Sequence, residues 1–133
     1  MLVLLAACGG EEPKPPEIGS FAEAAERTVS GMREFGAILG GVEDLASAEA
    51  AAPRLEALAK KLRAVVAAID RMPQGEAGPE IAGRVEEAFA ALSPATTAYI
   101  DCVLEAPEIG EVLAGPYGDV QHQLRTLLEM LGG

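Results

Sequence analysis

The chain contains one histidine, His122, and this limits the metal chemistry that the sequence can support. Motifs that need two histidines, such as His-Glu-x-x-His and the paired Glu-x-x-His of di-iron bundles, are absent. Asp119 stands three positions before His122, a spacing that supplies a single metal contact on a helix. We expect this pair to be solvated on an acidic surface, and we predict neither a metal site nor a cofactor.

A haem site is the alternative that the same histidine leaves open. Four-helix haem bundles of the b-type cytochrome kind bind iron through a methionine of the first helix and a histidine of the last. Met32 and His122 are the residues that could form such a pair here. Because Val120 and Leu124 define the apolar face of the last helix, His122 should point sideways or outward. A haem- or metal-binding four-helix bundle is therefore kept only as the alternative.

The other reactive side chains do not indicate catalysis. In an antiparallel hairpin turning at Ala106, Cys102 would lie roughly 18 Å along the helix from His122, too far for a catalytic pair. Cys102 has apolar neighbours and is expected to act as a small core residue, with an intermolecular disulfide or a reactive thiol as alternatives. A general acid needs a buried carboxyl, and Asp101 is the one acidic residue near an apolar stripe. We predict that the protein is not an enzyme.

Charge excludes one class of partner and suggests another. The net charge is -11 and the sequence pI is about 4.4, so the protein should repel nucleic-acid backbones and anionic headgroups. Lys60, Lys61 and Arg63 form the basic cluster of the chain, where an anionic protein partner could be attracted. Such a cluster is more often a solvated helix face, so partner binding there is a hypothesis.

Composition favours helices as the elements that carry these residues. The chain has 25 Ala, three Phe, two Tyr and no Trp among 133 residues, whereas a sheet would need more β-branched and aromatic side chains. Apolar residues recur at helical spacing in four segments. The predicted stripes are Ala25, Thr28, Met32, Phe35, Leu39 and Val42; Leu55, Leu58, Leu62, Val65, Ile69 and Met72; Ile81, Val85, Ala88, Leu92, Ala95, Tyr99 and Cys102; and Leu113, Tyr117, Val120, Leu124, Leu127 and Leu131.

Capping residues and prolines predict the helix ends. The first helix should begin at Ser20, with Glu23 in capping-box spacing, and end near Leu45. Ser47 should cap the second helix, and Pro53 should bend its first turns.

The second half of the chain should contain two more helices. The third begins at Pro79 and is expected to kink after Leu92, at Pro94, because the apolar stripe continues across that proline. A turn follows at residues 106–108. The fourth segment should be bent or interrupted at Gly115–Pro116 and end at Gly132–Gly133. Residues 18–133 are therefore predicted to form one all-α domain, an up-down-up-down four-helix bundle, with a three-helix bundle and a broken last element as the alternative.

The N-terminus carries the most specific motif. Leu5-Ala6-Ala7-Cys8 closes a short apolar run and resembles a bacterial lipobox. The resemblance implies that residues 1–7 are a signal peptide removed before Cys8, whose sulfur then carries diacylglycerol. The run is shorter than the usual 7 to 15 apolar residues and lacks a preceding basic residue, so a start codon further upstream is expected. The alternative is that residues 1–8 are a frayed apolar end of a soluble protein. A transmembrane helix is not expected, because about 20 apolar residues are needed to cross a bilayer.

A spacer should follow the lipidated cysteine. Residues 8–17 are rich in Pro, Gly and Glu, a composition typical of a semi-rigid tether. Gly9 stands where lipoproteins kept at the inner membrane carry Asp. The resemblance therefore implies a bacterial cell envelope protein, anchored at the outer rather than the inner membrane where the organism has both.

The domain itself gives a general functional expectation. The spacing Ile38-Leu39, Val42, Asp44, Ser47-Ala48, Ala51, Pro53, Leu55, Leu58 is similar to that of short helical bacterial lipoproteins, and this resemblance carries no activity with it. Ala48 to Ala52 and Ala88 to Ala91 would let a partner helix approach closely, or else would close the protein's own core. We expect a non-catalytic, membrane-anchored module with a protein-interaction or structural role at the envelope.

Overall fold

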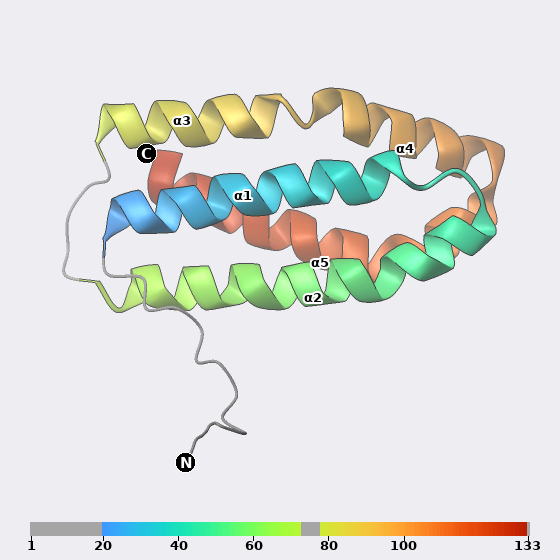
Figure 1. The fold of residues 1–133 in the computed structure, drawn as a ribbon, viewed down its shortest axis with the longest axis horizontal. Helices are drawn as coiled ribbons and strands as arrows, with labels where there is room; N and C mark the ends of the chain where they lie inside the picture. Colours follow the sequence, from blue (N-terminus) through green and yellow to red (C-terminus); the bar gives the residue numbers. More distant parts are fainter. Residues whose placement is uncertain (1–19, 73–77, 133) are drawn as a thin grey trace, which may run out of the picture.

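The computed structural model describes residues 20–72 and 78–132, which form an all-α four-helix bundle (Figure 1). Its helices are α1 (Phe21–Gly40), α2 (Leu45–Asp70), α3 (Pro79–Ala90), α4 (Ser93–Glu105) and α5 (Pro107–Gly132). Only two residues separate α3 from α4, so these helices make one bent rod, the α3–α4 rod. The four-helix prediction is confirmed, and the three-helix alternative is not found. Cys8 and the 8–17 spacer lie outside the described residues.

The helix starts follow local capping, with two corrections. The Ser20 side chain accepts a hydrogen bond from the Glu23 backbone N–H at 3.2 Å, as predicted. The predicted end of the first helix near Leu45 is wrong, because α1 ends at Gly40. The predicted cap of the second helix is also wrong, because Asp44 is the capping residue. Its carboxylate accepts from the Ser47 N–H at 2.8 Å, and the Ser47 hydroxyl accepts from the Asp44 N–H at 3.0 Å.

Prolines bend the helices to different extents. Pro53 lies inside α2, and the first turns of that helix run at an angle to the rest in Figure 1. Pro94 supplies no N–H, and the preceding Leu92 N–H bonds the Phe89 carbonyl at 3.1 Å, which tightens the chain at the predicted kink. Pro116 lies within α5, which continues to Gly132. The alternative of an interrupted last helix is therefore wrong.

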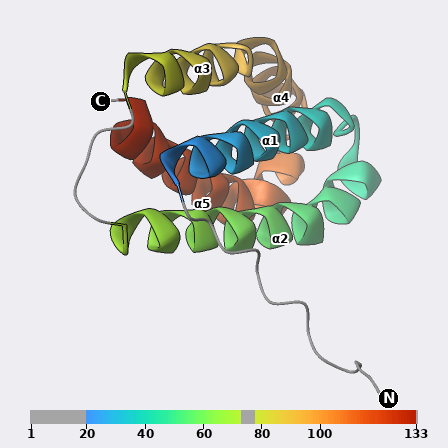
Figure 2. The same cartoon turned by 60° about the vertical axis from the view of Figure 1, so that its left-hand side comes forward.

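The helices alternate in direction, but their order around the bundle differs from their order in the chain. α1 and α5 lie between α2 on one side and the α3–α4 rod on the other (Figures 1 and 2). The most extensive contact is between the parallel helices α2 and α5. The rod packs beside α1, also in parallel.

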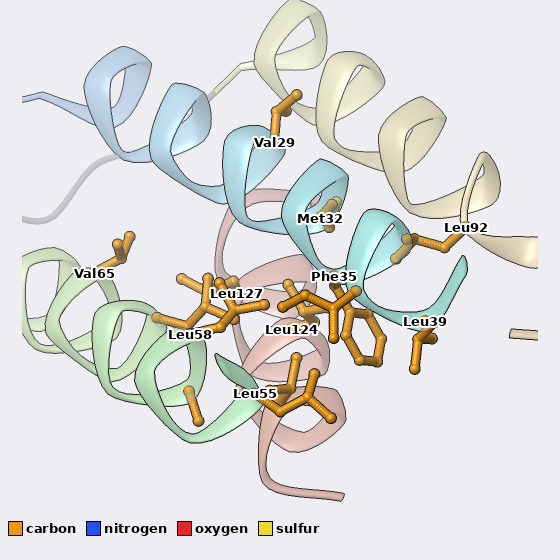
Figure 3. Close-up of a cluster of buried hydrophobic side chains, with 14 of the residues drawn as sticks. Val29, Met32, Phe35, Leu39, Leu55, Leu58, Val65, Leu92, Leu124 and Leu127 are labelled. Atoms are coloured by element: carbon orange, nitrogen blue, oxygen red, sulfur yellow. The ribbon is translucent and has the colours of Figure 1, made fainter. Parts of the chain in front are cut away.

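The predicted stripes form most of the core, and Figure 3 shows its centre. Val29, Ile38, Ile109 and several alanines are also buried, although they lie outside the predicted stripes. The first, second and fourth stripes are almost entirely buried, whereas the third is only partly so. Within the rod, Val85, Leu92 and Tyr99 are the described residues that are buried. The rod therefore covers the bundle less completely than the other helices do.

Candidate functional site

A groove between α1 and the α3–α4 rod is the larger of two cavities beside the kink. It has a volume of about 500 Å³, which falls within the usual range for ligand sites. Val29 and Met32 of α1 and Leu92 of the kink supply its buried apolar floor. In Figure 3, Val29 points from α1 toward the rod and Leu92 points back toward α1. We call this cavity the α1–rod groove.

Small residues keep the α1–rod groove open. Gly36 on α1 faces Leu92, and a Cβ built at Gly36 would lie 3.3 Å from the Leu92 Cδ2 atom. On the rod, the lining positions include Ala88, Ala91 and Ala95. Because none of these side chains extends beyond Cβ, the two parallel helices do not fill the space between them.

The groove carries cations along its rim. Arg33 from α1 and Arg84 from α3 both line it and both are exposed. Neither arginine forms an ion pair with another residue in the described part of the chain. Glu87 also lines the groove, so two arginines and one glutamate line it in a protein whose net charge is -11. The rim thus differs in sign from the protein as a whole.

A second, smaller cavity lies on the other side of the kink. Its volume is about 230 Å³, and it is lined by residues of α1, α5 and the rod. Phe35 and Phe89 give it apolar walls, whereas Gln121 and Arg125 of α5 bring polar groups to it. Leu92 lines both cavities.

An aromatic cluster joins the rod to α5 and α1. The rings of Tyr99 and Tyr117 stack with centroids 4.5 Å apart, and Phe35 lies 5.6 Å from Tyr117. Burial raises the pKa of Tyr99 above its usual 10.0, and the nearby Tyr117 adds to that effect. Burial also raises the pKa of Tyr117, although the Gln121 amide, which donates to its hydroxyl at 2.9 Å, opposes this. Both phenols are therefore neutral at physiological pH, and they serve packing.

The three residues of the predicted basic cluster have different surroundings in the structure. Lys61 forms an ion pair with Glu34 of α1 at 3.4 Å. Arg63 forms an ion pair with Asp119 of α5 at 3.2 Å. Lys60 is exposed and pairs with no described residue. Two of the three cations thus link α2 to its neighbours, and Lys60 is left to face solvent.

The candidate metal and haem residues do not come together around a cavity. Met32 is 1% exposed in the core, whereas His122 is exposed on α5. Asp119, the other half of the predicted metal contact, is engaged by Arg63. In residues 20–72 and 78–132, no group of three or more His, Cys, Asp or Glu side chains could hold a metal ion. This geometry does not favour the haem alternative.

Cys102 packs partly against the core. It is half-buried and free of any disulfide, and its thiol donates to the Val42 carbonyl at 3.5 Å. This contact ties α4 to the connection between α1 and α2. The predicted small-core role describes its position well, except that part of the side chain remains accessible.

The two alanine stretches have different surroundings. Ala48 and Ala51 of α2 are buried, at 0% and 4% exposure, so they pack in the core of the bundle. Ala88 and Ala91 line the α1–rod groove. Small residues therefore serve internal packing in the first stretch and leave an open space in the second.

Large apolar side chains are exposed at one end of the bundle. Ile100 and Leu104 on α4 are 51% and 75% exposed, and Leu45 at the start of α2 is 42% exposed. The end of α4 and the start of α2 lie at the same end of the molecule, opposite the start of α1 (Figure 1). We call these three residues the distal apolar residues.

The sequence analysis missed two of these features, the arginines of the groove and the exposed apolar residues of α4. Arg33 and Arg84 each stand directly beside a core residue in the chain, a common pattern for a solvated arginine. Their shared groove exists only because α1 and α3 are neighbours in space. Ile100 and Leu104 could have been found, since they are apolar residues four positions apart that lie off the predicted stripe.

Comparison with known proteins gives no relative to guide the assignment. No protein-family model matches the chain, and no curated protein or solved structure matches it significantly. No helix among the residues that the structure describes is long and apolar enough to cross a membrane.

Proposed function

We propose that this chain is a lipid-anchored, non-catalytic helical module that presents a binding surface to a protein partner at the bacterial cell envelope. The lipobox-like Leu5-Ala6-Ala7-Cys8 supports the anchor, with lipid on Cys8. The spacer of residues 8–17 would lead from the membrane to the bundle. The outer membrane is the proposed address where the organism has one.

The position of the distal apolar residues is the observation that carries the binding role. The spacer precedes α1 in the chain, and α1 is a helix of 20 residues. At 1.5 Å per residue, α1 carries the chain about 30 Å toward the opposite end. The start of α2, which is Leu45, and the last turn of α4, which contains Leu104, lie at that opposite end (Figure 1). An anchored bundle would thus hold exposed apolar side chains away from the membrane.

The pattern of exposure on α4 supports contact with a protein. Ile100 and Leu104 are four positions apart, so their side chains share one face of the helix. Single exposed apolar residues are ordinary, but adjacent large ones at a helix surface are typical of interaction sites. We therefore place the partner surface at the distal end, with Lys60 as a secondary contact for an anionic partner.

Membrane partition tests the anchor. The gene should be expressed with its upstream sequence, and cell extracts should be separated into detergent and aqueous phases. The wild-type protein is expected in the detergent phase, because the two or three acyl chains of a mature lipoprotein attach it stably to the membrane. A Cys8→Ser variant cannot carry this lipid and is expected in the aqueous phase. An aqueous wild-type protein, or a Cys8→Ser variant that stays with the membrane, refutes the anchor.

In-cell crosslinking tests the partner surface. A photoreactive residue at position 104 is expected to capture a defined protein, and Ile100→Glu with Leu45→Glu should abolish the capture. The matched control is Ala57→Glu with Ala64→Glu, which adds the same charge at exposed positions of α2. Equal capture by both double variants would show that the distal apolar residues do not form the interface.

Lys60 requires a separate variant. Reversing all three charges of the basic cluster would also break the ion pairs to Glu34 and Asp119, so a loss of binding could reflect a changed fold. Lys60→Glu alone leaves both ion pairs intact. A lowered crosslinking yield in this variant supports the anionic partner, and an unchanged yield removes Lys60 from the interface.

A further inference from the structure

We infer that the α1–rod groove binds a linear amphiphile with an anionic head group, of the fatty carboxylate class. The groove combines two features that such a ligand needs. It has a buried apolar floor made by Val29, Met32 and Leu92, and it has arginines on its rim that no described carboxylate engages. This site does not depend on lipidation of Cys8 or on the distal surface.

The shape of the groove selects a narrow alkyl chain. It lies between two parallel helices and extends along the rod from Arg84 to Ala95. Three alanines and one glycine are among its lining residues, and its volume is about 500 Å³. An alkyl chain can lie along this space and remove the apolar floor from water, whereas a bulky ring system would need the helices to separate.

Charge selects the head group. Arg33 and Arg84 are available because no described carboxylate pairs with either, although the chain has 21 acidic residues. Two guanidinium groups against Glu87 leave a net positive rim, which favours a carboxylate over a neutral or cationic head. The negative field of the rest of the protein would oppose anions elsewhere, so binding should be confined to this rim.

The test uses the full chain with Cys8→Ser, so that no acyl group carried by the protein itself competes. Dodecanoate labelled with ¹³C at the carboxyl carbon is titrated below its micelle-forming concentration and followed by NMR. We expect a saturable, one-to-one bound signal whose carboxyl titrates at lower pH than the free acid, because the arginines stabilise the charged form. The methyl ester of the same acid should bind at least about threefold more weakly, since it lacks the charge.

Two pairs of variants separate the groove from the rest of the surface. The double variant Arg33→Gln with Arg84→Gln should lose the preference for the acid over the ester. The control double variant, Arg54→Gln with Arg71→Gln, should keep this preference, because it removes the same charge from exposed positions outside the groove lining. Ala91→Phe fills the groove from an exposed position and should lower affinity about tenfold or more, because the alkyl chain loses the apolar surface that it covers. Ala98→Phe, at an exposed position outside the groove lining, should not.

Several outcomes would overturn the inference. These are the absence of a saturable signal, equal binding of acid and ester by the starting protein, or equal affinity in the Ala91→Phe and Ala98→Phe proteins. Circular dichroism of each variant establishes that its helices are retained, and the exposed positions of the substitutions favour this. A dimer that Ala91→Phe dissociates, with no effect of dodecanoate, would assign the groove to self-association instead.

Discussion

Single glycines in this bundle differ in what a side chain would meet. Gly83 lies in α3, exposed, with nothing within 4 Å of a Cβ built at that position. Gly83→Ala should therefore raise the free energy of unfolding by about 0.5–1 kcal/mol, the usual advantage of Ala inside a helix. Chemical denaturation of the two proteins measures this difference. An unchanged or lower stability would mean that α3 is not helical at this position.

Gly31 is the matching opposite case. A Cβ there would lie 2.7 Å from the buried Leu62 Cδ2 atom, where α1 approaches α2 closely. Gly31→Val should thus lower the unfolding free energy by about 1–3 kcal/mol through overpacking. If denaturation shows Gly31→Val to be as stable as the wild type, the close contact between α1 and α2 is absent in solution.

The two tyrosines give stability a dependence on alkaline pH. Burial raises the pKa of Tyr99 and Tyr117 in the folded protein, whereas an unfolded tyrosine loses its proton near 10.0. The unfolded state therefore binds fewer protons than the folded state above pH 10, and stability falls as pH rises through that region. Below pH 10 the contribution is fully present.

Urea unfolding between about pH 8 and 11.5 measures this effect against the reference pKa of tyrosine. A variant with Tyr99→Phe and Tyr117→Phe should lose less stability across the range than the wild type. Since lysines titrate in both proteins, the difference between the two slopes is the decisive quantity. Identical slopes would contradict the raised pKa values.

At the scale of the element, the start of α2 depends on a reciprocal cap. The Ser47 backbone N–H and hydroxyl bond Asp44 and lower the pKa of its carboxyl below 3.8. A lowered pKa in the folded state means that the carboxylate stabilises folding fully above pH 3.8 and that this contribution is lost as pH falls through the folded pKa. Asp44→Ala should therefore lower the midpoint of thermal unfolding at pH 7, because the first turn of α2 loses its side-chain acceptor.

Glu43→Ala is the matched control for this substitution. It removes the same charge one residue before the cap, and the Glu43 side chain takes no part in the hydrogen bonds between Asp44 and Ser47. The cost of Asp44→Ala should be smaller at pH 3 than at pH 7, where the carboxylate is fully charged. An equal loss of stability in Glu43→Ala would assign the effect to net charge near the helix start, and the reciprocal cap would then have no special role.

The faces of the helices were predictable from the sequence, whereas some of their ends were not. Leu55, Leu58 and Leu62 recur at helical spacing, and burial of one face follows directly from that spacing. The end of α1 was misplaced because Val42 continues the apolar register although the chain has already left the helix. The start of α2 was misplaced because Ser47 is a good capping residue alone, and only the structure shows it serving Asp44.

At the scale of the whole molecule, the α3–α4 rod should be the least stable part of the bundle. The two ion pairs between helices in the described part of the chain join α2 to α1 and to α5, and neither involves the rod. Cavities lie on both sides of its kink. Amides of α3 and α4 should therefore exchange with deuterium faster than those of α2 and α5 under native conditions.

Leu92→Ala sharpens this test. Leu92 is buried and lines both cavities, so its truncation should cost about 2–5 kcal/mol, the usual range for a core leucine. If the rod opens as a unit, exchange should accelerate mainly in α3 and α4. A uniform acceleration in all helices would show that the rod and the rest of the bundle unfold together.

The order of the helices around the bundle could not be predicted from the apolar pattern. Alternating direction follows from short connections, but the stripes do not say which neighbour each helix meets. The α1–rod groove and the pairings of Lys61 and Arg63 depend on that order. The candidate site was therefore missed, although most of the core was predicted; Val29, which contributes to the groove floor, lies outside the predicted stripes.

The stacked tyrosines Tyr99 and Tyr117 provide a spectroscopic signal for the packing of the rod against α5. The chain has two tyrosines and no tryptophan, and both tyrosines belong to the contact between α4 and α5. Their near-ultraviolet circular dichroism thus arises largely from one place, where the rod meets α5. A ligand that shifts the rod should change this signal while the far-ultraviolet spectrum, which reports total helix, stays constant. The unmodified protein therefore carries an optical probe at the contact between the rod and α5.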